Sequence, residues 1–192
     1  AVTLLVQRRP ERRVGTLASL NGALVLVVLV TGHTLEPVAL AAWAGHLALA
    51  VAGAATVSRF LPTFVGQAPG APLFRYHPLS GIAGLYSLAS LAGVPGTPGA
   101  MLWLESARSL VAGNRTELLL LLAAAWLAAL TAVMRQWRQA FGVSATVTPG
   151  APSREAADLM PPSRVPFEAR MALWISAVGL VTLGHMHLWR AH

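Results

Sequence analysis

Residues 78–112 read PLSGIAGLYSLASLAGVPGTPGAMLWLESARSLVA, and the interruption within this stretch is the most informative local feature of the sequence. Two apolar segments, Leu79–Ala92 and Ala100–Val111, flank the sequence GVPGTPG at residues 93–99. Two prolines and three glycines in seven residues cannot stay helical, because proline lacks the N–H donor and glycine loses the most conformational freedom. The sequence therefore predicts a membrane helix over 79–112 that is broken by the motif residues Gly93, Pro95, Gly96, Pro98 and Gly99.

Two interpretations of this interruption stay open at the level of sequence. Unpaired backbone at membrane depth is tolerated only inside protein or beside a water-filled cavity. Broken helices of this kind occur in ion-translocating proteins, where the ends of the half-helices face the transported charge. The same residues can instead form an ordinary loop between two separate elements, the second of which lies at the membrane interface.

The composition excludes several classes of protein. Of the 192 residues, 55% are hydrophobic and 11% charged, whereas a soluble domain carries about 25% charge and a disordered chain is poor in apolar residues. The absence of cysteine excludes disulfides, thiolate metal sites and iron–sulfur clusters in this chain. All 14 basic residues are arginine, so chemistry that requires lysine is absent. In a membrane protein the net charge of +7 reports topology, and we do not interpret it as nucleic-acid binding.

The apolar runs predict an all-α integral membrane bundle that forms a single domain over residues 1–192. Each uninterrupted span is close to the roughly 20 residues needed to cross about 30 Å of hydrocarbon. A proline-rich polar segment, 139–169, is predicted to be an inside loop. The five predicted spans are 14–32, 38–58, 79–112 with its break, 117–134 and 171–189.

The arginine positions orient this bundle. If the N-terminus lies inside and the spans alternate, eleven arginines lie in inside segments and three in outside segments, a strong positive-inside bias. The predicted topology has the N-terminus inside and the C-terminus outside, with five crossings, and it requires the broken stretch to cross once. The inside arginines are Arg8, Arg9, Arg12, Arg13, Arg59, Arg75, Arg135, Arg138, Arg154, Arg164 and Arg170, and the outside ones are Arg108, Arg115 and Arg190.

Two ionisable residues within the spans are candidate proton-relay groups. His46 lies near the middle of the second span, where it relays protons, ligates a haem or chlorophyll, or is a neutral histidine bonded to a neighbouring helix. Glu105 follows the break by six residues and is either a buried carboxylate or a surface partner of Arg108. The polar residues Asn21, Tyr86, Ser87 and Ser90 form interhelical hydrogen bonds or line a water path.

Residues near the helix ends support two further interpretations. His33, His185 and His187, with Met186, form a weak candidate copper site, because imidazole and thioether suit copper. Histidines are also common at wet helix ends, which explains the same residues without a metal. Four tryptophans are predicted to be interface anchors, namely Trp103, Trp137, Trp174 and Trp189.

The order of features resembles the antiporter-like membrane subunits of respiratory complex I. Arg75-Tyr76-His77-Pro78 supplies a basic-Pro lead-in, LASLAGVP at 88–95 the core and Thr97-Pro98-Gly99 the exit. The family has a similar run, LSLAGIPPTAGF. Residues 12–22, RRVGTLASLNG, are similar to the KRLLAYSSIAHAG-type helix start of the family. The spans at 117–138 and 171–189 resemble the next helix and the closing one.

Within this family the chain is most similar to NADH dehydrogenase chain 2, although chains 4 and 5 and the antiporter and hydrogenase relatives share the architecture. The resemblance covers essentially the whole sequence but only about the C-terminal third of a normal chain 2. It implies a C-terminal fragment of a split subunit, located in the mitochondrial inner membrane or, alternatively, a bacterial plasma membrane. The implied partners are the N-terminal fragment, other membrane-arm subunits and lipids.

The resemblance also implies where the chemistry lies. The complex transfers electrons from NADH to ubiquinone and pumps protons, with NADH, FMN, iron–sulfur clusters and ubiquinone bound elsewhere and no cofactor in this chain. Trp103 occupies the position of a family lysine in the proton-carrying axis, so the proton path is expected to be weakened or lost. His46 and Glu105 can titrate but match no family motif residue.

Two rivals come from other classes of function. One is a self-contained haem- or copper-binding membrane protein. The other is an accessory or structural subunit of another membrane complex, including other respiratory complexes.

Overall fold

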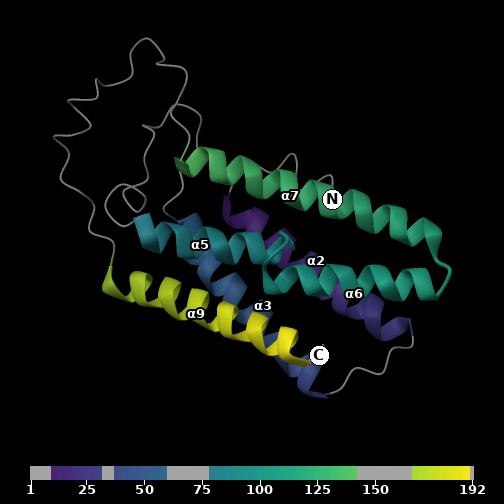
Figure 1. The fold of residues 1–192 in the computed structure, drawn as a ribbon. Coiled ribbons are helices and arrows are strands. Elements are labelled where there is room, and N and C mark those ends of the chain that lie inside the picture. The colour runs from purple at the N-terminus through teal and green to yellow at the C-terminus, as the bar shows by residue number, and fades with distance from the viewer. Residues whose placement is uncertain (1–9, 32–36, 60–77, 142–165, 191–192) are drawn as a thin grey trace, which may run out of the picture.

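The computed structural model describes residues 10–31, 37–59, 78–141 and 166–190, with only the backbone described for residues 10, 139–141 and 185–190. Every element in these ranges is a helix, which confirms the all-α prediction (Figure 1). The helices are α2 (Pro10–Val30), α3 (Pro37–Ser58), α5 (Pro78–Leu91), α6 (Pro98–Ala112), α7 (Thr116–Phe141) and α9 (Phe167–Arg190).

Proline marks where most of these helices begin. Pro10, Pro37, Pro78 and Pro98 are the first residues of α2, α3, α5 and α6. The first turn of a helix tolerates proline because its N–H has no partner there, and the fixed φ of the ring already suits the helix. Helix α9 begins at Phe167, four residues before the predicted start, and α7 extends to Phe141, seven residues past the predicted end.

Within the described ranges, four helices are long and apolar enough to cross a membrane: Glu11–Val30, Pro37–Ser58, Thr116–Arg138 and Phe167–Gly184. This indicates a membrane protein. Helices α5 and α6 have 14 and 15 residues and are each only about 21–23 Å long at 1.5 Å per residue, less than the roughly 30 Å of hydrocarbon. A crossing at this position therefore needs both half-helices, and five crossings stays a prediction.

Figure 1 shows how the two half-helices are arranged. They lie one after the other and run in the same direction, with α7 returning antiparallel beside them. The first residues of α2, α5 and α9 lie at the same end of the bundle as the last residues of α3 and α7. The helices therefore alternate in direction if α5 and α6 count as one crossing, as the predicted topology requires.

The arginines of the described helices separate along the bundle axis. The end at which α2, α5 and α9 begin carries more of them, and which side of a membrane this end faces stays a prediction. This arginine-rich end has Arg12, Arg13, Arg59, Arg135, Arg138 and Arg170, and the other end has Arg108, Arg115 and Arg190.

The core is built around α3, which packs against α9, α5 and α2. Small residues permit this close packing, as expected where helices associate in a bilayer. A Cβ atom added to Gly84 of α5 would lie 2.5 Å from Val57 Cβ of α3 and 3.0 Å from Leu173 Cδ2 of α9. Gly53 of α3 lies in the same way against Ser87 of α5. Glycine is thus required where α3 and α5 touch.

We predict that Gly84→Ala lowers the free energy of unfolding by about 1–3 kcal/mol, because the added methyl group overpacks the contact with Val57. Gly22→Ala in α2 is the matched control, since a Cβ there meets no atom within 4 Å. The control should be neutral or stabilising by up to about 1 kcal/mol, from helix propensity. Equilibrium unfolding in mixed detergent micelles, followed by circular dichroism, measures both. Equal losses in the two variants would contradict the close α3–α5 contact.

Candidate functional site at the helix break

Helix α5 ends in a capping motif that the sequence dictates. The N–H of Gly93 donates to the carbonyl of Ser90 at 3.1 Å, and the N–H of Val94 donates to the carbonyl of Ala89 at 3.0 Å. These two bonds form a Schellman motif, which needs a residue in the left-handed region at its centre, and Gly93 has φ of +68°. Helix α6 then begins with Pro98. An interruption is thus observed between α5 and α6, at residues 92–97. Pro98 and Gly99, which the sequence predicted to be part of the break, are instead the first residues of α6.

One side of the break lies inside the bundle and the other does not. Thr97, Pro98 and Gly99 are buried, whereas Pro95 and Gly96 are exposed. The N–H of Gly96 makes no hydrogen bond to any residue that the structure describes. The break therefore presents both a protein-lined face and an open backbone face.

A histidine and a serine join the two half-helices on the buried face. Nε2 of His46, in α3, lies 2.9 Å from Oγ of Ser90, in the last turn of α5. The N–H of Gly99, in the first turn of α6, donates to the same Oγ at 3.2 Å. His46 is 4% exposed and Ser90 is fully buried. This oxygen accepts a hydrogen bond from the Gly99 N–H. The Ser90 hydroxyl can therefore donate its own hydrogen bond to Nε2 of a neutral imidazole.

The approach of the half-helices at this point leaves no room for a side chain. A Cβ atom on Gly99 would overlap the carbonyl oxygen of Ser90 and lie 3.3 Å from Nε2 of His46. The glycine is therefore required by packing, because the last turn of α5, with its C-terminal carbonyls, lies close to the start of α6 beside His46.

Asn21 of α2 binds one of these carbonyls. Its Nδ2 donates to the carbonyl of Leu91, the last residue of α5, at 2.6 Å and to the carbonyl of Leu17 at 2.9 Å. Asn21 is 1% exposed, and its Oδ1 has no hydrogen-bond partner among the residues described. Asn21 and Ser90 thus form the interhelical hydrogen bonds that the sequence left as one alternative.

Two tryptophans fill the opposite side of the turn. Nε1 of Trp126, in α7, donates to the carbonyl of Gly93 at 3.1 Å. The ring of Trp126 stacks on Trp103 of α6, with 5.9 Å between centroids and 17° between planes. A Cβ atom on Gly93 would overlap the Trp103 ring, which is 1% exposed. Trp103 is therefore a packing residue of the break, and its interpretation as an interface anchor was wrong.

The two candidate relay residues are not brought together. Glu105 Oε2 lies 3.7 Å from Nη1 of Arg108, and the two side chains are 37% and 72% exposed, respectively. Glu105 is therefore a surface partner of Arg108, which is one of the two alternatives that the sequence left open. His46 is the ionisable residue that contacts the break in the described part of the chain.

The candidate copper residues are largely beyond what the structure describes. His33 lies outside the described residues, and the side chains of His185 and His187 are not described. Across the described ranges, no group of three or more histidine, cysteine, aspartate or glutamate side chains is placed to hold a metal ion.

Side chains from three other helices thus converge on the interrupted helix: Asn21 from α2, His46 from α3 and Trp126 from α7. Sequence reasoning missed Trp126, because a tryptophan in an apolar run gives no signal of a bond to a distant carbonyl. In chemical terms, the cluster fixes backbone polar groups and offers one pair, His46 and Ser90, through which a proton can be exchanged.

Comparison of the chain with protein-family models, curated proteins and solved structures finds no match.

We predict that Gly93→Ala destabilises the protein more than Gly96→Ala. Both glycines have positive φ, at +68° and +89°, so alanine costs about 1–2 kcal/mol of backbone strain at either position. The added methyl group also collides with Trp103 at position 93, whereas it meets no atom within 4 Å at position 96. Thermal unfolding followed by circular dichroism measures the difference.

A double variant separates the two effects. In a Trp103→Ala background the collision is removed, so Gly93→Ala should cost no more than Gly96→Ala. If the extra cost of Gly93→Ala persists without the indole, Trp103 is not packed into the turn as described.

Proposed function

We propose that this chain is a membrane-arm subunit of the proton-pumping NADH:ubiquinone oxidoreductase, corresponding to the C-terminal part of an antiporter-like chain 2. The observation that carries the proposal is the break between α5 and α6, whose inner face is held by side chains of α2, α3 and α7. Interrupted helices are a property of ion-translocating membrane proteins, and an ordinary loop between two rods would not need such support.

The open face of the break supports a fragment that requires a partner. Pro95 and Gly96 are exposed, and the Gly96 N–H makes no hydrogen bond to the described residues. An unsatisfied backbone group in hydrocarbon costs several kcal/mol. Protein that covers residues 95–96 would remove this cost, and the missing N-terminal helices of a split subunit are the partner we propose.

We propose further that the proton path through this chain is weakened or lost. The indole of Trp103 stands where the family has a lysine, and it stacks on Trp126 at the break. An indole cannot take up and release a proton near neutral pH. The Glu105 carboxylate is paired with Arg108 on the exposed side of α6. The task of the chain would then be structural, with NADH, FMN, iron–sulfur clusters and ubiquinone bound by other subunits.

The same resemblance suggests in which membrane the complex is located. We propose the mitochondrial inner membrane, with a bacterial plasma membrane as the alternative. The haem- or copper-binding alternative gains no support from His46, because its Nε2 is engaged by Ser90.

We predict that an affinity-tagged chain, extracted from its native membrane in mild detergent, comigrates with core subunits of complex I. The mass-spectrometric inventory of that band should include a second polypeptide carrying the missing N-terminal helices. The control is the same tag on an unrelated membrane protein of the same membrane. A chain that purifies alone as a monodisperse monomer would contradict the fragment proposal, and a Soret band in that sample would favour the haem alternative.

We predict that Glu105→Gln and His46→Gln leave the number of protons pumped per electron unchanged in assembled complex, because the path through this chain is not used. Proton uptake and NADH oxidation in sealed vesicles measure the ratio, and comigration with the core subunits verifies assembly. A reduced ratio in His46→Gln with normal electron transfer would refute a lost path and assign proton transfer to the buried histidine. Glu105→Gln is then the matched control, as an exposed carboxylate outside the break.

A further inference from the structure

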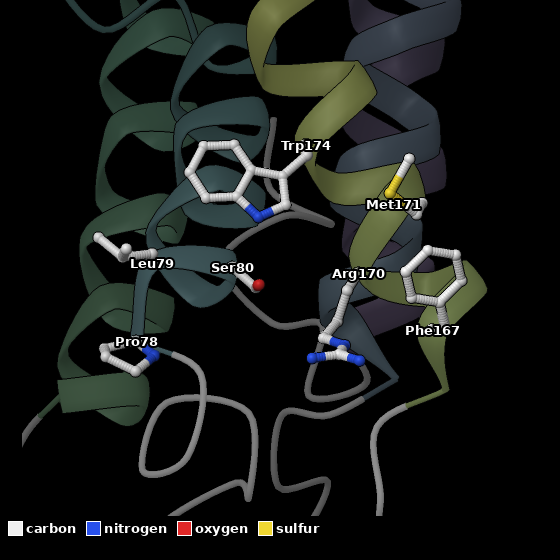
Figure 2. A pocket seen from close by; sticks show the side chains of 7 residues that line it. All are labelled: Pro78, Leu79, Ser80, Phe167, Arg170, Met171 and Trp174. Atoms are coloured by element: carbon white, nitrogen blue, oxygen red, sulfur yellow. The ribbon is translucent and has the colours of Figure 1, made fainter.

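A pocket of about 420 Å³ lies between the first turns of α5 and α9, away from the helix break (Figure 2). It is at the arginine-rich end of the bundle. Its lining among the described residues is Pro78, Leu79 and Ser80 from α5, and Phe167, Arg170, Met171 and Trp174 from α9. Neither the helix break nor the resemblance to complex I accounts for it.

The pocket holds hydrogen-bond donors, and no acidic side chain lines it among the residues that the structure describes. Figure 2 shows the hydroxyl of Ser80, the guanidinium of Arg170 and the indole nitrogen of Trp174 around one space. Nε of Arg170 is buried and makes no hydrogen bond to the residues that the structure describes. The carboxylate nearest in sequence, Glu168, is exposed and is not part of the lining. The pocket is therefore suited to an anion with several acceptor oxygens.

The guanidinium of Arg170 is held at the edge of the pocket by its own helix. Its carbon atom lies 5.9 Å from the centroid of the Phe167 ring, a cation–π contact. A planar guanidinium binds phosphate through two parallel hydrogen bonds. The first turns of α5 and α9 both lie here, so the positive ends of two helix dipoles add to the same potential.

An apolar surface leads from the pocket toward the middle of the bundle. Leu79 and Ile82 are exposed on α5 at a spacing of three residues, and Trp174 and Val178 are exposed on α9 at a spacing of four. Residues at these spacings lie on one face of a helix. The polar groups thus lie near the end of the bundle and the exposed apolar ones continue along α5 and α9, which matches a molecule with a charged head and a hydrocarbon tail.

We propose that this pocket binds the phosphate of an anionic phospholipid, with its acyl chains along the exposed faces of α5 and α9. Arg170 binds the phosphate oxygens, Ser80 and Trp174 donate further hydrogen bonds, and Leu79 and Met171 contact the glycerol and upper acyl region. The site needs only a chain embedded in a bilayer, so it is independent of the proposed role in complex I.

The test measures how many lipid molecules bind to the full chain. The chain is first extracted in mild detergent with its native partners and is then delipidated. Phosphatidylglycerol, phosphatidylcholine or inorganic phosphate is added, and native mass spectrometry measures binding. Phosphatidylglycerol should bind more tightly than phosphatidylcholine. Arg170→Gln should weaken phosphatidylglycerol binding about fivefold, the effect of one basic residue near an anionic lipid.

Matched variants keep the test decisive. Arg115→Gln removes an exposed arginine at the opposite end and should leave phosphatidylglycerol binding unchanged. Trp174→Phe keeps an aromatic ring but removes the donor, and should give a smaller loss than Arg170→Gln. Should Arg170→Gln fail to fold, Ser80→Ala and Trp174→Phe together provide the readout.

Three outcomes would overturn the proposal. Equal binding of phosphatidylcholine would show that anionic charge is not recognised. Equal losses in Arg115→Gln and Arg170→Gln would show diffuse attraction to the basic protein. Displacement of phosphatidylglycerol by millimolar inorganic phosphate would assign the pocket to a free anion, because a lipid anchored by its acyl chains resists that competition.

Discussion

The structure depends on the need to satisfy backbone polar groups where one helix stops and another begins inside a hydrocarbon-facing bundle. Residues 93–97 cannot be helical, so the last carbonyls of α5 lose their usual partners. The bundle supplies substitutes from other helices. Asn21 binds the carbonyl of Leu91, and Trp126 binds the carbonyl of Gly93. Each substitute lies on a different helix, so the break holds α2 and α7 in register with α5.

The same constraint determines what the ionisable residues can do. His46 is buried against the break, where its ring bonds the Ser90 hydroxyl. Glu105 lies partly exposed on α6, beside Arg108. Trp103 fills the space next to Gly93 with an uncharged indole. The centre of the bundle is consequently polar enough to bind backbone groups, yet has few groups that exchange protons.

The two ends of the bundle differ in their arginine content, and this difference does not involve the helix break at the centre. Arginines gather where α2, α5 and α9 begin, and the pocket of about 420 Å³ lies among them between α5 and α9. The break links helices within the protein, whereas this pocket links the protein to the surrounding lipid. The two features use different residues of α5, since Ser80 is in its first turn and Ser90 in its last.

The helical class and an interruption near residues 93–99 could be predicted from the sequence alone, whereas five crossings stays a prediction. Apolar runs, prolines and glycines act locally, through hydropathy and backbone geometry, so their effect can be predicted without knowledge of neighbouring helices. Which side chains reach the break became known only from the packed structure. The bonds of Asn21 and Trp126 join residues 70 and 33 positions apart, and helical periodicity alone does not give the rotation of one helix against another. For the same reason the burial of Trp103 and the exposure of Glu105, two residues apart on α6, became apparent only once the packed faces were known.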